Sequence, residues 1–235
     1  MKKTLITGVA GFIGFYAAKR ELEKGNYVIG VDNLNNYYEP KIKKDRLNIL
    51  KKEKNFLFFK EDLNSKNFYK KLKKYLKDIE VVIHLAGQAG VRYSIKNPES
   101  YILNNILAYI KLLEFFKFSK KLKTILYASS SSVYGEKNEN KLSNSSVNRP
   151  VSVYSASKIS MELISNVYSN LYSMNLIGLR FFTVYGPWGR PDMAYFKFLI
   201  SNKKKKKIEI YNFGKHQRSF TYIDDLISNM FKILS

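Results

Sequence analysis

A tyrosine and a lysine stand four residues apart in the run Tyr154-Ser-Ala-Ser-Lys158. On a helix, positions i and i+4 share a face, so the phenol and the ammonium would point at one site. A nearby lysine stabilises a phenolate and lowers the pKa of the tyrosine, which can then accept the proton of a substrate hydroxyl. The pair therefore predicts proton transfer with Tyr154 as acceptor. Because the chain has 18 tyrosines, the pair carries weight only beside other signals.

A glycine-rich turn, Gly8-Val-Ala-Gly11-Phe-Ile-Gly14, follows the first predicted strand. Glycines there let the backbone turn tightly and approach a pyrophosphate, which then lies on the N-terminus of the next helix. Asp32 closes the second predicted strand. A carboxylate at that position can accept hydrogen bonds from a ribose diol and would repel a 2′-phosphate. The sequence thus predicts a dinucleotide site that prefers NAD to NADP.

The elements that would position these groups alternate along the chain. Strand-like runs are expected over residues 3–7, 27–31, 56–60, 81–84 and 124–128. Helices are expected over 12–24, where Gly25 ends the pattern, and from Pro98 through Leu103, Ile106, Ile110 and Leu113. This order indicates an α/β fold, a Rossmann-type doubly wound parallel sheet with helices on both faces. The polar stretch 136–149 is expected to be a surface loop.

The composition excludes several classes of site and location. The absence of cysteine excludes disulfides and thiolate metal sites, and two histidines cannot form a histidine-rich metal site, so no metal is expected. No apolar run approaches the roughly 20 residues of a membrane span. The start of the chain reaches glycine too soon for a signal-peptide core. We therefore expect a cytoplasmic protein without membrane insertion.

The formal net charge of +22 would ordinarily suggest a nucleic-acid partner. Most of the basic residues are lysines spread through nearly every segment, whereas arginine, the better reader of phosphates and bases, is scarce. A solvated lysine surface is the simpler interpretation. No specific nucleic-acid partner is expected.

Further motifs follow the later strands in order: Asp62-Leu63, His84-Leu85-Ala86-Gly87, Asn104, and Ser129–Ser132 before Val133-Tyr134-Gly135. With the Gly-x-x-Gly-x-x-Gly spacing, this series resembles the extended short-chain dehydrogenase/reductase family, also called the NAD-dependent epimerase/dehydratase family. The resemblance implies NAD as cofactor and Tyr154, Lys158 and Ser130 as catalytic residues. The serine run could otherwise be a simple turn. The cofactor contacts that the resemblance implies are Gly8, Gly11, Phe12, Ile13, Gly14, Asp32, Asn33, Asp62, Leu63, Leu85, Ala86, Gly87, Asn104, Ser129, Tyr154, Lys158 and Phe181.

Residues 90–94, 179–193 and 217–225 are similar to the UDP-glucuronate 4-epimerases within that family. Sugar-nucleotide dehydratases and decarboxylases carry acidic residues after the catalytic serine, where this chain has Ser131-Ser132, which can hold a carboxylate but cannot drive an elimination. Arg190 could instead form a surface salt bridge. The substrate contacts that the resemblance implies are Arg92, Ser130, Ser131, Ser132, Thr183, Arg190, Lys197, Tyr211 and Arg218.

The function implied is the 4-epimerisation of UDP-glucuronate to UDP-galacturonate, and family resemblance also implies a homodimer. Two alternatives stay open: another nucleotide-sugar enzyme such as a UDP-glucose/galactose 4-epimerase, and an impaired NAD-binding fragment. We expect an NAD-binding domain over 1–180 and an incomplete substrate-binding region over 181–235. Family members continue for about a hundred residues beyond Asp225, a length typical of the rest of a second domain, so the chain is expected to be truncated.

Overall fold

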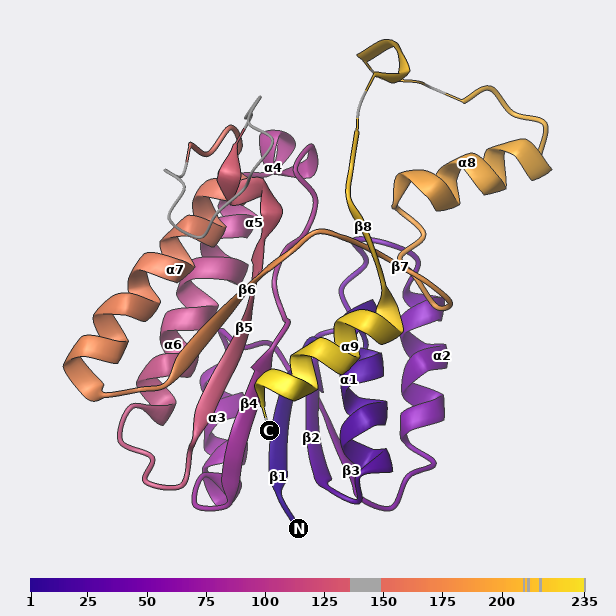
Figure 1. Cartoon of the computed structure of the whole chain (residues 1–235). Coiled ribbons are helices and arrows are strands. Elements are labelled where there is room, and N and C mark those ends of the chain that lie inside the picture. Colours follow the sequence, from indigo (N-terminus) through magenta and orange to yellow (C-terminus); the bar gives the residue numbers. More distant parts are fainter. Residues whose placement is uncertain (136–148, 209, 211, 216, 235) are drawn as a thin grey trace.

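A six-stranded sheet forms the centre of the molecule in the computed structural model, which describes residues 1–135, 149–208, 210, 212–215 and 217–234 (Figure 1). Its strands are β1 (Lys3–Thr7), β2 (Tyr27–Asp32), β3 (Phe56–Lys60), β4 (Ile79–His84), β5 (Thr124–Ser130) and β6 (Leu176–Phe181). They are all parallel, in the order β3-β2-β1-β4-β5-β6. The order reverses between β1 and β4, where the carboxyl ends of the strands of an open α/β sheet form a ligand crevice.

Helices cover both faces of this sheet. The helices in chain order are α1 (Phe12–Glu23), α2 (Pro40–Leu50), α3 (Lys66–Leu72), α4 (Tyr93–Lys96), α5 (Glu99–Tyr101), α6 (Ala108–Phe116), α7 (Val153–Tyr172), α8 (Ala194–Lys203) and α9 (Ile223–Ile233). Of these, α1, α2 and α9 lie on one face of the sheet and α3, α6 and α7 on the other. Shorter turns are the 3-10 segments η1 (Lys73–Tyr75), η3 (Ser131–Tyr134) and η4 (Asn212–Gly214), and the π-helical segment η2 (Ile102–Leu107). The expected doubly wound α/β class is confirmed.

Two apolar cores lie on the two faces of the sheet because successive side chains of a strand point in opposite directions. On β1, Ile6 packs into the core with α1, α2 and α9, whereas Leu5 packs into the core with α3, α6 and α7. Both side chains are fully buried. The sheet is therefore covered on both faces, as parallel sheets usually are.

The helix expected from Pro98 consists of α5, η2 and α6 in succession. The wider π-helical turn changes which side chains face the core. Leu103 is 49% exposed, whereas Asn105 and Tyr109 are fully buried. The sequence spacing therefore located this helix but did not identify its buried face.

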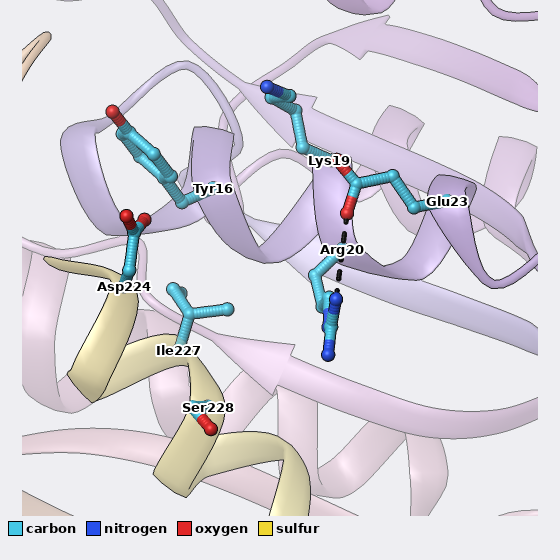
Figure 2. A pocket seen from close by; sticks show the side chains of 7 residues that line it. All are labelled: Tyr16, Lys19, Arg20, Glu23, Asp224, Ile227 and Ser228. Atoms are coloured by element: carbon cyan, nitrogen blue, oxygen red, sulfur yellow. Dashed lines mark ion pairs between the residues drawn. The ribbon is translucent and has the colours of Figure 1, made fainter.

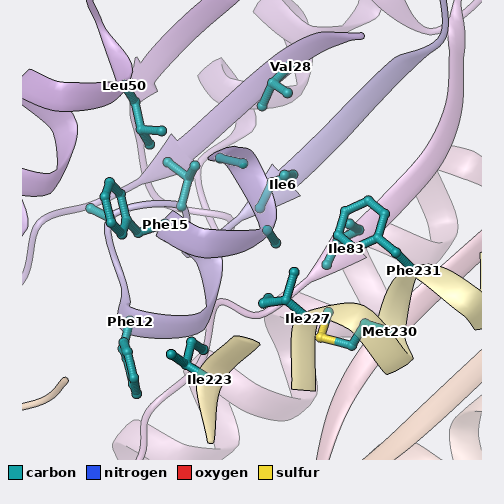
Figure 3. Packing of buried hydrophobic residues seen from close by; sticks show 14 of the residues in the cluster. Ile6, Phe12, Phe15, Val28, Leu50, Ile83, Ile223, Ile227, Met230 and Phe231 are labelled. Atoms are coloured by element: carbon teal, nitrogen blue, oxygen red, sulfur yellow. The ribbon is translucent and has the colours of Figure 1, made fainter. Parts of the chain in front are cut away.

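The segment after β6 forms a short sheet of two parallel strands, β7 (Thr183–Tyr185) and β8 (Phe220–Tyr222). The next helix, α9, returns to the main core, where Ile223, Ile227 and Met230 pack in one cluster with Phe12 and Phe15 of α1 (Figure 3). The division of the chain at residue 180 stays a prediction.

Within the residues that the structure describes, no helix combines the length and the apolar character needed to cross a membrane. The expected surface loop at 136–149 falls almost entirely outside the described residues.

Candidate active site

The glycine turn brings the end of β1 against the end of β4. Gly8 adopts φ +69°, and a Cβ at this position would lie 2.7 Å from the backbone nitrogen of Ala86. At Gly14 a Cβ would lie 2.2 Å from the carbonyl oxygen of Gly8. The turn is therefore closed to side chains, and α1 begins within this run at Phe12, with Gly11 as its N-cap. The first N–H groups of a helix have no intrahelical acceptor, which makes this end suited to an anion.

Asp32, at the end of β2, accepts hydrogen bonds from two backbone N–H groups, that of Ala10 at 3.1 Å and that of Leu34 at 2.8 Å. Burial raises the pKa of this carboxyl, and those two bonds and the charges of Lys43 and Arg46 oppose the rise. The carboxylate thus lies beside the glycine turn, where a ribose of a dinucleotide would come within its reach.

Two further residues of the predicted cofactor site meet at the ends of β2 and β3. The side-chain amide of Asn33 donates to the carboxylate of Asp62 at 2.8 Å. Asp62 also accepts from the N–H of Asn64 at 2.7 Å. Leu63 beside it is buried. The residues expected to surround an adenosine are thereby held together by their own hydrogen bonds.

The end of β4 is tied to β1 through one threonine. The Thr7 hydroxyl contacts Nδ1 of His84 at 2.8 Å and accepts from the N–H of Ala86 at 3.1 Å. Burial, together with the charge of Lys158, lowers the pKa of His84 to about 3, so the imidazole is neutral at physiological pH. His84 therefore serves as a packed, hydrogen-bonded support for Leu85, Ala86 and the backbone that follows.

Asn105 braces the two sides of the crevice. Its side chain accepts from the N–H of Gln88 at 2.7 Å and donates to the hydroxyl of Ser157 at 2.9 Å. A Cβ on Gly87 would lie 2.7 Å from the Asn105 oxygen. The sequence resemblance implied the neighbouring Asn104, whose amide donates to the Ser100 carbonyl at 2.7 Å. Its cofactor role stays a prediction, and the bracing residue was missed.

Tyr154 and Lys158 lie in the first turns of α7. This helix starts at a capping box, in which the side chains of Ser152 and Ser155 each bond the other's backbone. The Lys158 ammonium donates to the carbonyl of Ala128 at 2.8 Å. Burial lowers the pKa of Lys158 to about 8. The cap and this bond fix α7 against the end of β5.

Tyr154 is hydrogen-bonded to Ser130, the last residue of β5. Burial raises the pKa of Tyr154, and the Ser130 bond and the positive charge of Arg190 oppose the rise. In the chain alone, desolvation of the phenolate outweighs the positive charge of Arg190, and Lys158 has no share in the shift. Ser130 and Tyr154 meet here, whereas Lys158 reaches the carbonyl of Ala128 on the same strand. The catalytic roles of the three residues stay a prediction.

The remaining serines of the run take different partners. Ser132 donates its hydroxyl to Ser130 at 3.0 Å, and Ser131 lies beside it on η3. Ser129 is buried and donates its hydroxyl to Glu162. Glu162 in turn forms a bidentate pair with Arg180, with N–O distances of 3.0 and 2.8 Å. The Ser129 hydroxyl therefore already has a partner within the protein. Its contact with a cofactor stays a prediction.

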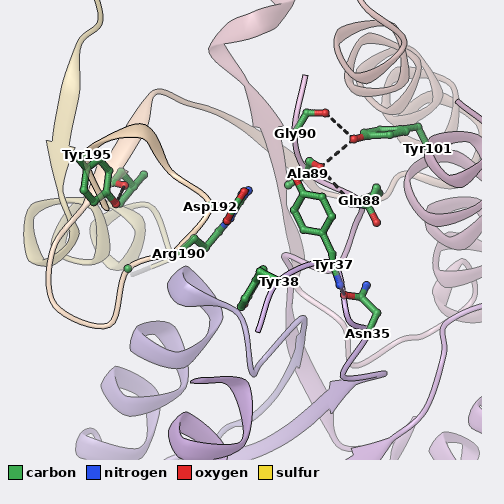
Figure 4. Close-up of polar contacts among 12 residues, drawn as sticks. Asn35, Tyr37, Tyr38, Gln88, Ala89, Gly90, Tyr101, Arg190, Asp192 and Tyr195 are labelled. Atoms are coloured by element: carbon green, nitrogen blue, oxygen red, sulfur yellow. Dashed lines mark hydrogen bonds and ion pairs between the residues drawn. The ribbon is translucent and has the colours of Figure 1, made fainter. Parts of the chain in front are cut away.

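Arg190 forms a bidentate pair with Asp192, with N–O distances of 3.0 and 2.5 Å. The two side chains are only 24% and 22% exposed. The Arg190 guanidinium lies over the Tyr37 ring, 5.8 Å from its centre (Figure 4). The salt bridge considered from sequence is present, but it faces the crevice beside Tyr154.

Other predicted site residues lie around or outside this cluster. Phe181 pairs with Ser130 across β6 and β5, and the N–H of Thr183 donates to the Ser219 carbonyl at 3.3 Å. Arg92 lies exposed at the start of α4, Lys197 is exposed on α8, and the exposed Arg218 donates to its neighbour Gln217 at 2.7 Å. Phe12 and Ile13 form the first turn of α1. Tyr211 lies outside the described residues.

Aromatic residues that the sequence analysis did not single out line the same cluster. The Tyr101 hydroxyl donates to the carbonyls of Ala89 at 2.9 Å and Gly90 at 2.5 Å (Figure 4). Its ring meets that of Tyr154 edge-on, with centroids 6.0 Å apart. The tyrosine-rich composition hid these residues, because only the folded chain shows which tyrosines converge.

A groove of about 310 Å³ lies elsewhere, between α1 and α9 (Figure 2). Its lining residues are Tyr16, Lys19, Arg20, Glu23, Asp224, Ile227 and Ser228. None of the predicted site residues lines it, so it is separate from the Tyr154 cluster.

The chain is similar to proteins of known family over its whole length. A family model described as the NAD dependent epimerase/dehydratase family matches residues 4–235. Protein CapI of Staphylococcus aureus is 47% identical over 235 residues, which cover 99% of this chain and 69% of that protein. The probable UDP-glucuronate 4-epimerase of Rhizobium meliloti is 41% identical, with 97% of this chain and 67% of that protein covered.

A solved structure agrees in fold. The UDP-glucuronic acid 4-epimerase of Bacillus cereus, in complex with UDP-glucuronic acid and NAD, superposes with a TM-score of 0.93 at 36% identity. The match covers 99% of this chain and 73% of that one. With its glycine turn, its serine–tyrosine–lysine cluster and these likenesses, the chain belongs to the NAD-dependent epimerase/dehydratase family.

Proposed function

We propose that this protein catalyses the NAD-dependent 4-epimerisation of a nucleotide sugar, with UDP-glucuronate as substrate and UDP-galacturonate as product. One observation carries the proposal: Ser130 and the positive charge of Arg190, a mostly buried arginine, both oppose the rise in the pKa of Tyr154. A proton acceptor beside a cation suits a substrate that carries both a reacting hydroxyl and a carboxylate. The named relatives that act on UDP-glucuronate support it.

The residues at the carboxyl ends of β1, β2 and β4 fit a dinucleotide. A Cβ at Gly8 or Gly14 would clash with the neighbouring backbone. Because glycine has no Cβ, the chain can turn tightly here and its backbone can approach a pyrophosphate. Asp32 would accept from a ribose diol, and Asp62 with Asn33 would hold an adenine. Bound NAD would accept a hydride from C4 of the sugar and return it to the opposite face, while its positively charged ring favours ionisation of Tyr154.

The chain's own groups would move one proton and hold the sugar. Tyr154 accepts the proton of the C4 hydroxyl as the C–H bond at C4 breaks, and Ser130 hydrogen-bonds the same oxygen. Lys158, held at the Ala128 carbonyl one turn after Tyr154 on α7, would supply a positive charge on the same face of the helix. After the 4-keto sugar has turned, Tyr154 returns the proton to the oxygen. The UDP group supplies binding energy while the sugar turns.

The carboxylate of the sugar has two sets of partners within reach of the same cluster. Ser131 and Ser132 can donate hydroxyl hydrogen bonds, and Arg190 can form a bidentate bond. Asp192 already accepts from Nε and Nη2 of Arg190. A sugar carboxylate would therefore bind the other edge of the guanidinium, formed by Nη1 and the second Nη2 N–H, without displacing Asp192. Holding that carboxylate would also hinder loss of CO2 from a β-keto acid.

A neutral UDP-hexose is the second candidate substrate, because Tyr154, Ser130 and Lys158 would act on it in the same way. Incubating the protein with NAD and either UDP-glucuronate or UDP-glucose, and identifying the products by proton NMR, separates the two. We expect UDP-galacturonate to form at least tenfold faster than UDP-galactose. Faster conversion of UDP-glucose would reverse the assignment, and NAD binding with neither product would favour a silent NAD-binding protein.

We also propose that two copies of the chain pair through the outer face of α7 and η2. Large apolar side chains face solvent there: Leu163, Val167 and Leu171 on α7, and Ile102, Leu103 and Leu107 on η2. The α7 residues are spaced i, i+4 and i+8, which makes a continuous stripe that can lie against its own two-fold copy. Light scattering of the eluted protein should give twice the chain mass. Val167→Glu should halve that mass, and Leu199→Glu, at an exposed leucine of α8, should not.

A further inference from the structure

Arg46 of α2 is fully buried and joins segments that are far apart in the sequence. Its guanidinium donates to the carbonyl of Ala10 at 2.8 Å and to the hydroxyl of Tyr38 at 3.0 Å. It also donates to the carbonyls of Trp188 at 2.5 Å and Gly189 at 3.4 Å. One side chain therefore connects the glycine turn, the loop after β2 and the loop that carries Arg190.

The loop held by Arg46 has a strained backbone. Trp188 adopts φ +60°, in the left-handed region that side chains other than glycine rarely occupy. Such a conformation costs free energy and persists only where the surrounding contacts impose it. The bonds from Arg46 to Trp188 and Gly189 are contacts of this kind, and the next residue is Arg190.

A chain of hydrogen bonds leads from the proposed cofactor site to this loop. Asp32 accepts from the N–H of Ala10 at 3.1 Å, and the carbonyl of the same Ala10 accepts from Arg46. A ribose diol bound at Asp32, or a pyrophosphate bound at the glycine turn, would therefore affect the position of Ala10, whose carbonyl accepts a hydrogen bond from Arg46. Burial raises the pKa of Asp32 and the charges of Lys43 and Arg46 oppose that rise, so the two ends are also linked electrostatically.

We propose that Arg46 is a positioning residue that joins the glycine turn to the loop presenting Arg190, so that NAD binding fixes the group that selects an anionic sugar. This inference rests on the function proposed above. It assigns Arg46 no contact with the reacting atoms. A purely structural role would lower stability alone, whereas a positioning role changes the Trp188 loop and the choice of sugar at temperatures where the protein is folded.

Trp188 is the one tryptophan of the chain, so its fluorescence reports on this loop alone. Its indole is 38% exposed and packs 5.9 Å from the ring of Phe15. Acrylamide quenching would be measured with and without saturating NAD for the unmutated protein, Arg46→Met and Arg46→Lys. The matched control is Arg20→Met, because Arg20 is an exposed arginine of α1 that pairs with Glu23.

In the unmutated protein and in Arg20→Met, we expect NAD to reduce the quenching of Trp188. Without NAD, Arg46→Met should be quenched at least about twofold more strongly, because the freed loop relaxes. Added NAD should no longer protect Trp188 in this variant. Arg46→Lys keeps the positive charge and an ammonium that can donate hydrogen bonds, so its quenching should lie between that of the unmutated protein and that of Arg46→Met. Quenching and NAD protection identical to the unmutated protein in both variants would overturn the proposal.

Calorimetric titration with UDP-glucuronate and with UDP-glucose, both in the presence of NAD, provides the second measurement. The ratio of the two Kd values should shift at least tenfold toward the neutral sugar in Arg46→Met, with partial recovery in Arg46→Lys. An unchanged ratio would also overturn the proposal. If the unmutated protein does not distinguish the sugars, the proposed function is wrong, and the Trp188 measurement still decides the role of Arg46.

Discussion

The Lys158 ammonium donates a hydrogen bond to the carbonyl of Ala128 at 2.8 Å, which anchors the lysine of α7 to the strand that ends at Ser130. Tyr154, one turn earlier on α7, is bonded to Ser130 itself. Strand and helix are therefore cross-linked at two points around the reacting groups. The relationship explains how Ser130 of β5 keeps its position relative to Tyr154 and Lys158, which lie on a helix later in the chain.

Tyr154→Phe should remove the proton acceptor and keep the ring. We expect kcat to fall by about 10²- to 10⁴-fold, the usual contribution of a positioned acid or base. NAD binding should be unchanged, because Asp32 and the glycine turn are untouched. Steady-state kinetics and calorimetric NAD titration check both parts. Tyr172→Phe, at the far end of the same helix, should retain full activity, and near-normal activity of Tyr154→Phe would contradict the assigned chemistry.

Asp32→Ala should weaken NAD binding and reduce the preference of the protein for NAD over NADP. A charge-assisted hydrogen bond to a ribose is worth about 1.5–3 kcal/mol, so Kd for NAD should rise by roughly one to two orders of magnitude. The affinity for NADP should fall less than that for NAD, because the carboxylate that repels the 2′-phosphate of NADP is gone. Titrating both cofactors into both proteins checks this, and equal binding of NAD and NADP by the unmutated protein would refute it.

Gly14→Ala should abolish NAD binding, because its Cβ would lie 2.2 Å from the Gly8 carbonyl oxygen and would force the turn apart. Overpacking of this kind commonly costs about 1–3 kcal/mol of stability. Gly25→Ala is the matched control, since Gly25 lies just after the other end of α1 and has nothing within 4 Å of the position that a Cβ would take. Gly25→Ala should lose some stability through its φ of +74° and keep NAD. Retained NAD affinity in Gly14→Ala would argue against the pyrophosphate site.

Replacing both Ser131 and Ser132 with alanine should weaken the binding of UDP-glucuronate more than the binding of any neutral UDP-hexose. Each lost hydrogen bond to a carboxylate costs on the order of 1.5–3 kcal/mol. Kd or apparent KM for the uronate should therefore rise at least tenfold relative to that for UDP-glucose. The Ser130 hydroxyl stays in place, so chemistry on bound sugar should continue. Equal losses for both sugars would show that these serines do not face the carboxylate.

Lys158 predicts a stability change at alkaline pH. Burial lowers its pKa from 10.5 to about 8, so between these values the unfolded chain holds a proton that the folded chain has lost. Stability therefore rises as the pH increases from about 8 to 10.5, by roughly 3 kcal/mol in the linkage relation. Urea unfolding of the unmutated protein and Lys158→Met over this range should show the difference. Parallel curves would contradict the prediction, and exposed Lys19→Met should give such a parallel curve.

The sheet, its helices and the dinucleotide turn were predictable because their signals are local. Gly8, Gly11 and Gly14 stand at fixed spacing between a strand and a helix, and each expected strand is present within a few residues of its predicted limits. Tyr154 and Lys158 were predictable because helix geometry puts i and i+4 on one face. The hydrogen bond between Asn33 and Asp62 was not predicted, although the sequence did predict the two strands that these residues follow.

Other features depend on contacts between distant segments and had no local signal. Arg46 reaches Trp188, 142 positions later, and only the fold shows that an arginine in a lysine-rich helix is fully buried. Asn105 differs from Asn104 by one position, and the π-helical turn decides which faces the crevice. Burial raises the pKa of Tyr154 in the chain alone, and the sequence could not show this because it reveals neighbouring charges but not burial.

The central claim is that one hydride leaves C4 of the sugar and returns to the same carbon. It is tested by incubating the protein and NAD with UDP-glucuronate that carries deuterium at C4, in ordinary water. We expect UDP-galacturonate that retains deuterium at C4, as read by proton NMR and mass spectrometry, and no product from Tyr154→Phe. Loss of the deuterium to solvent, or deuterium-retaining UDP-glucuronate with no epimer formed, would contradict the account.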